Sequence, residues 1–151
     1  MRRELEAYQL KDQLFLHGKK RTDRTVPILS EPVYKYDNGT DATVIGKTVR
    51  ECIESFYEGY PHPSREEFKK VNDPLIKLAG EKSSKSFFTK VRWVGVIEKD
   101  GKISFAPTEN HGWKEGFKNT EHPNIELDYA SATDEDLGKA LLKAFELSSI
   151  K

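Results

Sequence analysis

The stretch from Ser86 to Pro107, SFFTKVRWVGVIEKDGKISFAP, is the most apolar part of the chain and predicts the centre of the fold. Its apolar side chains fall on both parities: Val91, Trp93 and Ile97 on one, Phe88, Val94 and Val96 on the other. A strand with this pattern is covered on both faces and is expected inside a sheet. Asp100-Gly101 accepts the positive φ values of a tight turn, and 102–106 alternates polar and apolar residues. The stretch therefore predicts a central β-hairpin.

Three further segments carry apolar side chains at helical spacing and predict helices at about 43–57, 64–79 and 133–148. Each begins at a residue that can accept the free backbone N–H groups of a first turn: Asp41 or Thr43, Ser64, and Thr133. Glu67 completes a capping box with Ser64, and Asp136 stands at the same spacing from Thr133. Pro74 must break or restart the second helix, because it lacks an N–H group.

The other segments predict short strands and loops. Short strands are expected at 14–17, 26–29, 33–36 and 125–129, and Pro27 restricts its strand to an edge or a strand start. Three segments lack a clear strand pattern: 1–10, a short helix or frayed arm, 18–24, a basic turn or loop, and 108–124, a long loop. The expected fold is one α+β domain over residues 1–151, with an antiparallel sheet and about three packed helices.

Two of the predicted helices share an internal motif. Ile45-Gly46-Lys47-Thr48-Val49 matches Leu137-Gly138-Lys139-Ala140-Leu141. Glycine inside a helix costs about 1 kcal/mol relative to alanine, so both positions need a common reason. The motif predicts that each helix packs closely on a neighbouring backbone.

Charge and cysteine content limit the classes of protein. The chain has 25 basic and 25 acidic residues, whereas a dedicated nucleic-acid binder usually has a basic excess. The charges are unevenly placed, with a basic segment over 1–50 and an acidic one over 121–136, which suits a charged protein partner. A single cysteine, Cys52, allows no internal disulfide. With no signal sequence and no apolar run of 18 residues, we expect a cytoplasmic protein.

No pattern of catalytic or metal-ligating residues stands out. The four histidines lack zinc spacing and are expected to be solvated residues of loops, and Cys52, on an apolar helix face, is expected to be structural. Glu109 and Glu115 could serve as an acid–base pair with a loop histidine, but no nucleophile or cofactor motif accompanies them. We therefore expect no cofactor and no metal.

The segment 108–124 is the best candidate for binding. Trp113 stands between glycines and acidic residues, a setting typical of an interface anchor, although its ring could instead fold back on the core.

Several segments together resemble the immunity proteins of bacterial contact-dependent growth inhibition (CDI) systems, a family once known only as a domain of unknown function. The resemblance covers about 41–145 and is most specific in the run Ala132-Thr133-Asp134-Glu135-Asp136-Leu137-Gly138-Lys139-Ala140-Leu141-Leu142-Lys143-Ala144-Phe145. It also includes 72–83, Phe87, Phe88, 94–96, Pro107-Thr108 and Gly116-Phe117, and the N-terminal third matches little.

The resemblance implies a non-enzymatic inhibitor that binds the C-terminal toxin domain of a cognate CDI effector. Such toxins are commonly nucleases, often tRNases, with a basic cleft that an inhibitor can oppose with acids. The residues expected to face the toxin are Glu109, Trp113, Glu115, Glu121, Glu126 and Asp128. The basic N-terminal half could be the docking face instead, if the toxin is acidic there.

Two other functions remain open from the residues alone. One is a small nucleic-acid-binding module that grips single strands with the basic 19–24 loop and nearby aromatics (Lys19, Lys20, Arg21, Arg24, Tyr34, Tyr36). The other is an enzyme that uses Glu109 and Glu115, which a buried carboxylate with a raised pKa would indicate.

Overall fold

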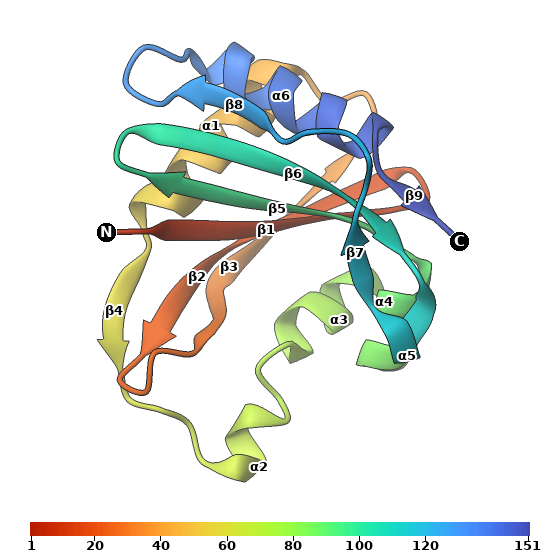
Figure 1. Ribbon diagram of the computed structural model, residues 1–151. Coiled ribbons are helices and arrows are strands. Elements are labelled where there is room, and N and C mark those ends of the chain that lie inside the picture. Colours follow the sequence, from red (N-terminus) through yellow and green to blue (C-terminus); the bar gives the residue numbers. More distant parts are fainter.

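A computed structural model describes all 151 residues and shows one curved sheet of nine strands with helices on both faces (Figure 1). The main strand order is β3-β2-β1-β5-β6-β7, and every pair along it is antiparallel, whereas β4 and β9 pair in parallel with β2 and β6. The strands are β1 (Arg3–Leu10), β2 (Gln13–Thr22), β3 (Pro27–Asp37), β4 (Tyr57–Tyr60), β5 (Arg92–Lys99), β6 (Lys102–Asn110), β7 (Phe117–Asn119), β8 (Ile125–Asp128) and β9 (Ser149–Ile150). The predicted α+β class is confirmed.

The predicted hairpin forms from β5 and β6 and lies inside the sheet, with β1 on the other side of β5. Asp100 and Gly101 have φ values of 52° and 83°, as a tight two-residue turn requires. The strand prediction was wrong before Arg92, because 84–90 forms helix α4 (Ser84–Lys90). Ser83 caps this helix by accepting a hydrogen bond from the Ser86 backbone N–H, so Phe88 lies on a helix rather than a strand.

Helices α1 (Ala42–Glu54) and α6 (Asp134–Glu146) lie side by side on one face of the sheet and interlock through their glycines (Figure 1). A Cβ built on Gly46 would lie 1.6 Å from the Asp134 carbonyl oxygen, and one on Gly138 would lie 1.8 Å from that of Ala42. The predicted close packing of the repeated motif is thereby confirmed. The caps predicted at Asp41 and Thr133 also form.

The other face carries four short helices, so the chain has six helices rather than about three. The helix predicted at 64–79 is in fact two, α2 (Arg65–Phe68) and α3 (Asp73–Ala79), because Pro74 restarts the chain at the beginning of α3. The capping box of Ser64 and Glu67 forms as predicted. With α4, α3 covers a second core cluster of Tyr8, Leu10, Phe15, Leu29, Leu75, Ile76, Phe87 and Val91.

Three weakly patterned segments differ from their predictions. Residues 3–10 are strand β1 rather than a helix or frayed arm, and most of 18–24 extends strand β2. The expected loop 108–124 holds the end of β6, a single helical turn α5 (Gly112–Glu115) and β7. Strands 26–29 and 33–36 are one continuous edge strand, β3, which begins at Pro27 as expected. The sheet partners, rather than local propensity, define these elements.

Candidate interaction surface

The face of the sheet opposite α1 and α6 changes character halfway along its strands. On this face β2 presents Phe15 and then His17, Lys19 and Arg21, while the alternate residues Leu14 and Leu16 pack toward α1 and α6. The antiparallel β1 runs the other way, from Glu4 and Glu6 to Tyr8 and Leu10. The apolar half of the face lies under α3 and α4, and no helix packs over the charged half.

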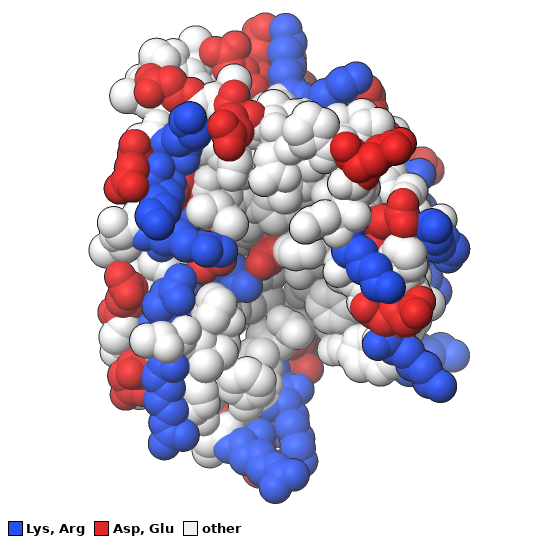
Figure 2. Space-filling view, in the orientation of Figure 1, with Lys and Arg blue, Asp and Glu red and all other residues white.

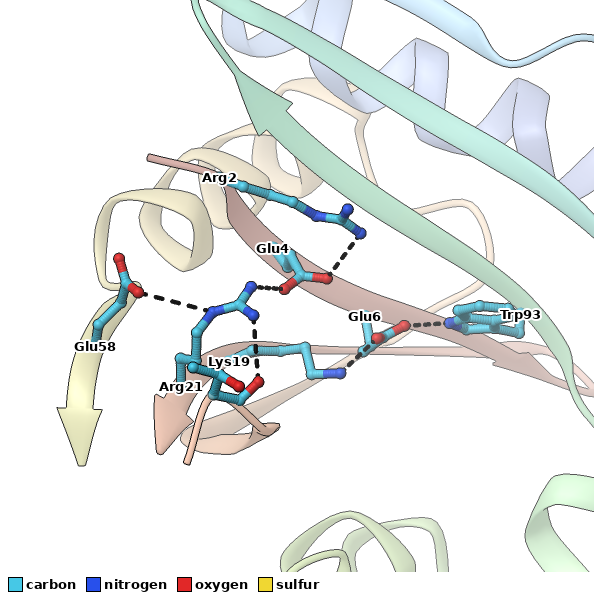
Figure 3. A network of polar contacts seen from close by, with 8 residues as sticks. Arg2, Glu4, Glu6, Lys19, Arg21, Glu58 and Trp93 are labelled. Atoms are coloured by element: carbon cyan, nitrogen blue, oxygen red, sulfur yellow. Dashed lines mark hydrogen bonds and ion pairs between the residues drawn. The ribbon is translucent and has the colours of Figure 1, made fainter. Parts of the chain in front are cut away.

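The charged half holds two adjacent sets of polar contacts, one around Glu6 and one around Glu4 (Figure 3). Lys19 Nζ lies 2.8 Å from Glu6 Oε1, and the indole N–H of Trp93 donates to the other Glu6 oxygen. Arg21 Nη2 donates to Glu4 Oε2 at 2.9 Å and its Nε lies 3.9 Å from a carboxylate oxygen of Glu58 on β4, while Arg2 pairs with the second Glu4 oxygen. The side chains of Glu4, Glu6, Lys19 and Arg21 are only 12–21% exposed.

Trp93 links the Glu6 contacts to strand β7. Its ring lies across Gly95, where an added Cβ would be 3.1 Å from the indole, and it packs against Phe117 of β7 at 5.2 Å between ring centroids. A side chain at position 95 would therefore displace the indole that holds Glu6.

Figure 2 shows this side of the molecule hollowed in its centre, with lysine and arginine side chains along the left and lower margins. A cavity of about 500 Å³ lies between β2, β3, β4 and the α2–α3 segment. Its lining is Lys20, Ile28, Leu29, Ser30, Glu31, Tyr57, Tyr60, Pro63, Glu67, Lys70, Val71 and Pro74. Lys20 Nζ lies 3.7 Å from the centroid of the Tyr60 ring, so the cavity combines aromatic and cationic groups.

The predicted anchor Trp113 is exposed at one corner of this side, on α5. Trp113 is 49% exposed, and its ring stacks on Phe88 of α4. The buried side chain of Asn110 holds the corner together. Its amide donates to the carbonyls of Phe88 and Val91 at 2.9 and 2.8 Å, and its oxygen accepts from the Gly112 N–H. Trp113 neither points freely into solvent nor folds into the core.

Three of the predicted acids lie near this corner. Glu109 Oε1 is 2.7 Å from His111 Nε2 and 3.5 Å from Lys151 Nζ, and the contacts with His111 and Lys151 lower the pKa of Glu109 despite partial desolvation, which acts in the opposite direction. Glu115 lies 3.9 Å from His111 and is mostly exposed. Glu121 lines a shallow pocket with Glu109, His122 and Glu146.

The other two predicted acids, Glu126 and Asp128, lie on β8. Glu126 is opposite Ser104 of β6, five residues from Glu109, a separation of about 17 Å along the strand. Because Ile125 and Leu127 pack on the core under α6, the alternate residues Glu126 and Asp128 point away from α6. Glu126 pairs with Lys102 at 3.6 Å, and Asp128 accepts hydrogen bonds from Ser131.

Cys52 and His17 are both buried. Cys52 is buried, and this burial raises its pKa to about 12, so the thiol stays protonated. Burial also lowers the pKa of His17 to about 4, and its Nε2 has no hydrogen-bond partner. His17 is therefore a residue of the sheet interior, which corrects the expectation of solvated loop histidines. No group of three or more His, Cys, Asp or Glu side chains is arranged to hold a metal ion.

The residues considered for gripping nucleic acid do not converge. Tyr34 and Tyr36 lie opposite Leu16 and Leu14 and pack toward α1, where the Tyr36 hydroxyl bonds Thr48. Lys19 and Arg21 point to the other face and are paired with glutamates. No helix of the protein has the length and apolarity needed to cross a bilayer.

Comparison with known proteins identifies the family. The family model described as "CDI immunity protein" matches residues 30–148. The chain belongs to the CDI immunity protein family. The solved structures similar to it show the same fold at low sequence identity, and the search of curated proteins found no match.

Two of these structures cover almost the whole chain. One is a "Protein of Unknown Function NMB0488" from Neisseria meningitidis, with a TM-score of 0.77 and 14% identity over 98% of this chain and 96% of that one. The other is a "CdiA-CT/CdiI toxin and immunity complex" from Yersinia pseudotuberculosis, with a TM-score of 0.78 and 12% identity over 98% of both chains. Strands β1 and β2 therefore belong to the shared fold, although the family model begins only at residue 30.

Sequence reasoning missed the charged half of the sheet face. Glu4, Glu6 and Trp93 were assigned no role, and Lys19 and Arg21 were placed on a loop. Two signals were present: the alternation of Arg3-Glu4-Leu5-Glu6-Ala7, and the lone Gly95 within a strand, which often marks the close approach of another group.

Proposed function

We propose that this CDI immunity protein acts inside the cell that makes it, where it binds the C-terminal toxin domain of a cognate CDI effector and blocks its activity without catalysis. The family membership and the hollowed face, with its mostly buried charged floor, support this function. A solved complex with the same fold is named as a toxin and immunity complex, which supports the choice of partner.

We propose the hollowed side as the docking face. The charged floor lies on this side of the sheet (Figure 3), together with the short helices α2 to α5 (Figure 1), of which α5 carries Trp113 and the α2–α3 segment lines the cavity. A standard interface buries about 800 Å² per partner, a patch about 30 Å across. That patch is wide enough to include Glu109 together with Glu126, which lies about 17 Å away along β6.

The toxin is proposed to be a nuclease, with tRNA as its candidate substrate. A nuclease that binds a phosphate backbone presents cationic side chains, which acids can oppose at the rim of the docking face. The proposed acidic contacts are Glu109, Glu115, Glu121, Glu126 and Asp128, with Trp113 as the apolar anchor among them. Trp113 is suited to this role because Phe88 and Asn110 already hold its ring in place.

Co-expression with the toxin domain encoded beside this gene tests the function. We expect a stable complex in co-purification, nanomolar affinity by calorimetry and restored growth of cells that express the toxin. Failure of both rescue and complex formation would refute the proposal. A salt titration of RNA binding by the immunity protein alone would then test the nucleic-acid alternative.

Charge reversal of single acids tests the rim. Glu115→Lys should weaken toxin binding, whereas Glu51→Lys, a change at an exposed residue of α1, should not. Nuclease activity of the free toxin, measured on tRNA and on DNA, tests the enzyme class independently of the docking face.

A further inference from the structure

The charged floor of the hollow consists of two neighbouring rows of opposite sign. Glu4 and Glu6 form the acidic row on β1, and Lys19 and Arg21 form the basic row on β2 (Figure 3). Each carboxylate has two partners: Glu4 contacts Arg2 and Arg21, and Glu6 contacts Lys19 and Trp93. These contacts hold the four side chains in defined positions before any partner arrives.

Folding alone does not require charges at these positions. Half-buried ion pairs lose much of their hydration, and replacing such pairs with apolar side chains is often neutral or stabilising. Further along the same two strands, Tyr8 and Phe15 are apolar and lie under α3 and α4. The charges occur only where no helix covers the face. This placement favours a role in contacting a partner over a role in forming the core.

The position of the two rows in the sequence points to specificity. Both lie in residues 1–29, outside the range matched by the family model, whereas the strands that carry them are part of the shared fold. An immunity protein must distinguish its own toxin from related ones, and paired charges discriminate strongly because a like-charge contact is costly.

We propose that Glu4, Glu6, Lys19 and Arg21 determine which toxin this protein accepts. This inference rests on the proposed function. The partner is a segment of the toxin domain that places a cationic side chain over the β1 row and an acidic side chain over the β2 row. Tyr57 and Tyr60, at the edge of the adjoining cavity, supply apolar contact beside the charges.

The test exchanges the charges within one pair. The double variant Glu6→Lys/Lys19→Glu keeps an internal ion pair but reverses both rows at that point. We expect its affinity for the cognate toxin domain to fall about 100-fold or more, because two contacts become repulsive. The matched control is Glu135→Lys/Lys139→Glu, which exchanges a pair 2.7 Å apart on the outer surface of α6 and should bind like the wild type.

A second variant separates a loss of toxin contact from a loss of folding. Glu6→Gln/Lys19→Met removes both charges and should keep or raise the melting temperature, yet bind the toxin at least tenfold more weakly. Circular dichroism checks the fold of each variant. If either floor variant is folded and binds within threefold of the wild type, the specificity proposal is wrong while the toxin-binding function stands. If the wild type itself binds no toxin, both are wrong.

Discussion

The two faces of the sheet are covered in contrasting ways. On one face, α1 and α6 are each 13 residues long, and their glycines bring the two backbones into contact. On the other, α2 to α5 have four to seven residues each, α2 has no buried residue, and the cover is incomplete. The first face supplies a rigid scaffold, and the second leaves half of its surface available to a partner.

The largest expected effect comes from the glycine contact. Gly138→Ala should destabilise the protein by about 3 kcal/mol, because its methyl group would overlap the Ala42 carbonyl and force α1 and α6 apart. Urea denaturation measures the loss. Lys47→Ala, an exposed change one residue from the equivalent glycine of α1, should stay within about 0.5 kcal/mol of the wild type. Equal stability of the two variants would contradict the interlocked scaffold.

The next largest effect is a dependence of stability on pH, caused by the buried His17. The pKa of His17 is lowered from 6.5 to about 4 by burial, so between these values the unfolded chain binds the proton and the folded chain does not. Stability is therefore full above about pH 6.5 and falls by about 3 kcal/mol as the pH drops to about 4. Denaturant titrations at several pH values measure the slope.

Carboxyl groups cause a further loss of stability at the acidic end of this range and below it, so a variant is needed as the reference. Glu81, Glu109 and Asp136 also have lowered pKa values, and their contributions decline as the pH falls through those values. His17→Gln removes only the contribution of the histidine to the pH dependence. The stability of this variant should therefore fall less steeply between pH 6.5 and 4. An unchanged slope would show that His17 is not buried in its neutral form.

A moderate effect is expected at the corner that holds Trp113. Asn110→Ala should cost about 2 kcal/mol, because the Phe88 and Val91 carbonyls at the end of α4 lose their donor. It should also increase the solvent quenching of Trp113 fluorescence, with Trp93→Phe as the background that isolates this signal. A corner that stays rigid without Asn110 would leave the quenching unchanged.

The smallest effect is expected in α2. Phe68 is 40% exposed and stacks only on His62, so Phe68→Ala should change stability by less than about 0.5 kcal/mol. The same lack of packing should make Lys69 and Lys70 early sites of trypsin cleavage, before any cut within α1 or α6. Protection of these sites in the toxin complex would place α2 at the interface. Cleavage of α1 or α6 at the same time as α2 would show that the two faces do not differ in local stability.

The sequence alone determined the elements that have strong local signals. The β5–β6 hairpin followed from its Asp-Gly turn and apolar strands, α1 and α6 from their caps and stripes, and the close helix contact from the repeated glycine motif. These signals act within a few residues, so no partner segment is needed to recognise them.

Only the tertiary structure decided the charged floor and the corner around Trp113. Glu4, Glu6, Lys19 and Arg21 look like a solvated arm and a basic loop until β1 and β2 pair and bring the charges together. In the same way, Asn110 becomes a structural bridge only where α4, α5 and β6 meet. Strand pairing joins residues distant in sequence, and whether a charge is solvated, paired or offered to a partner depends on that pairing.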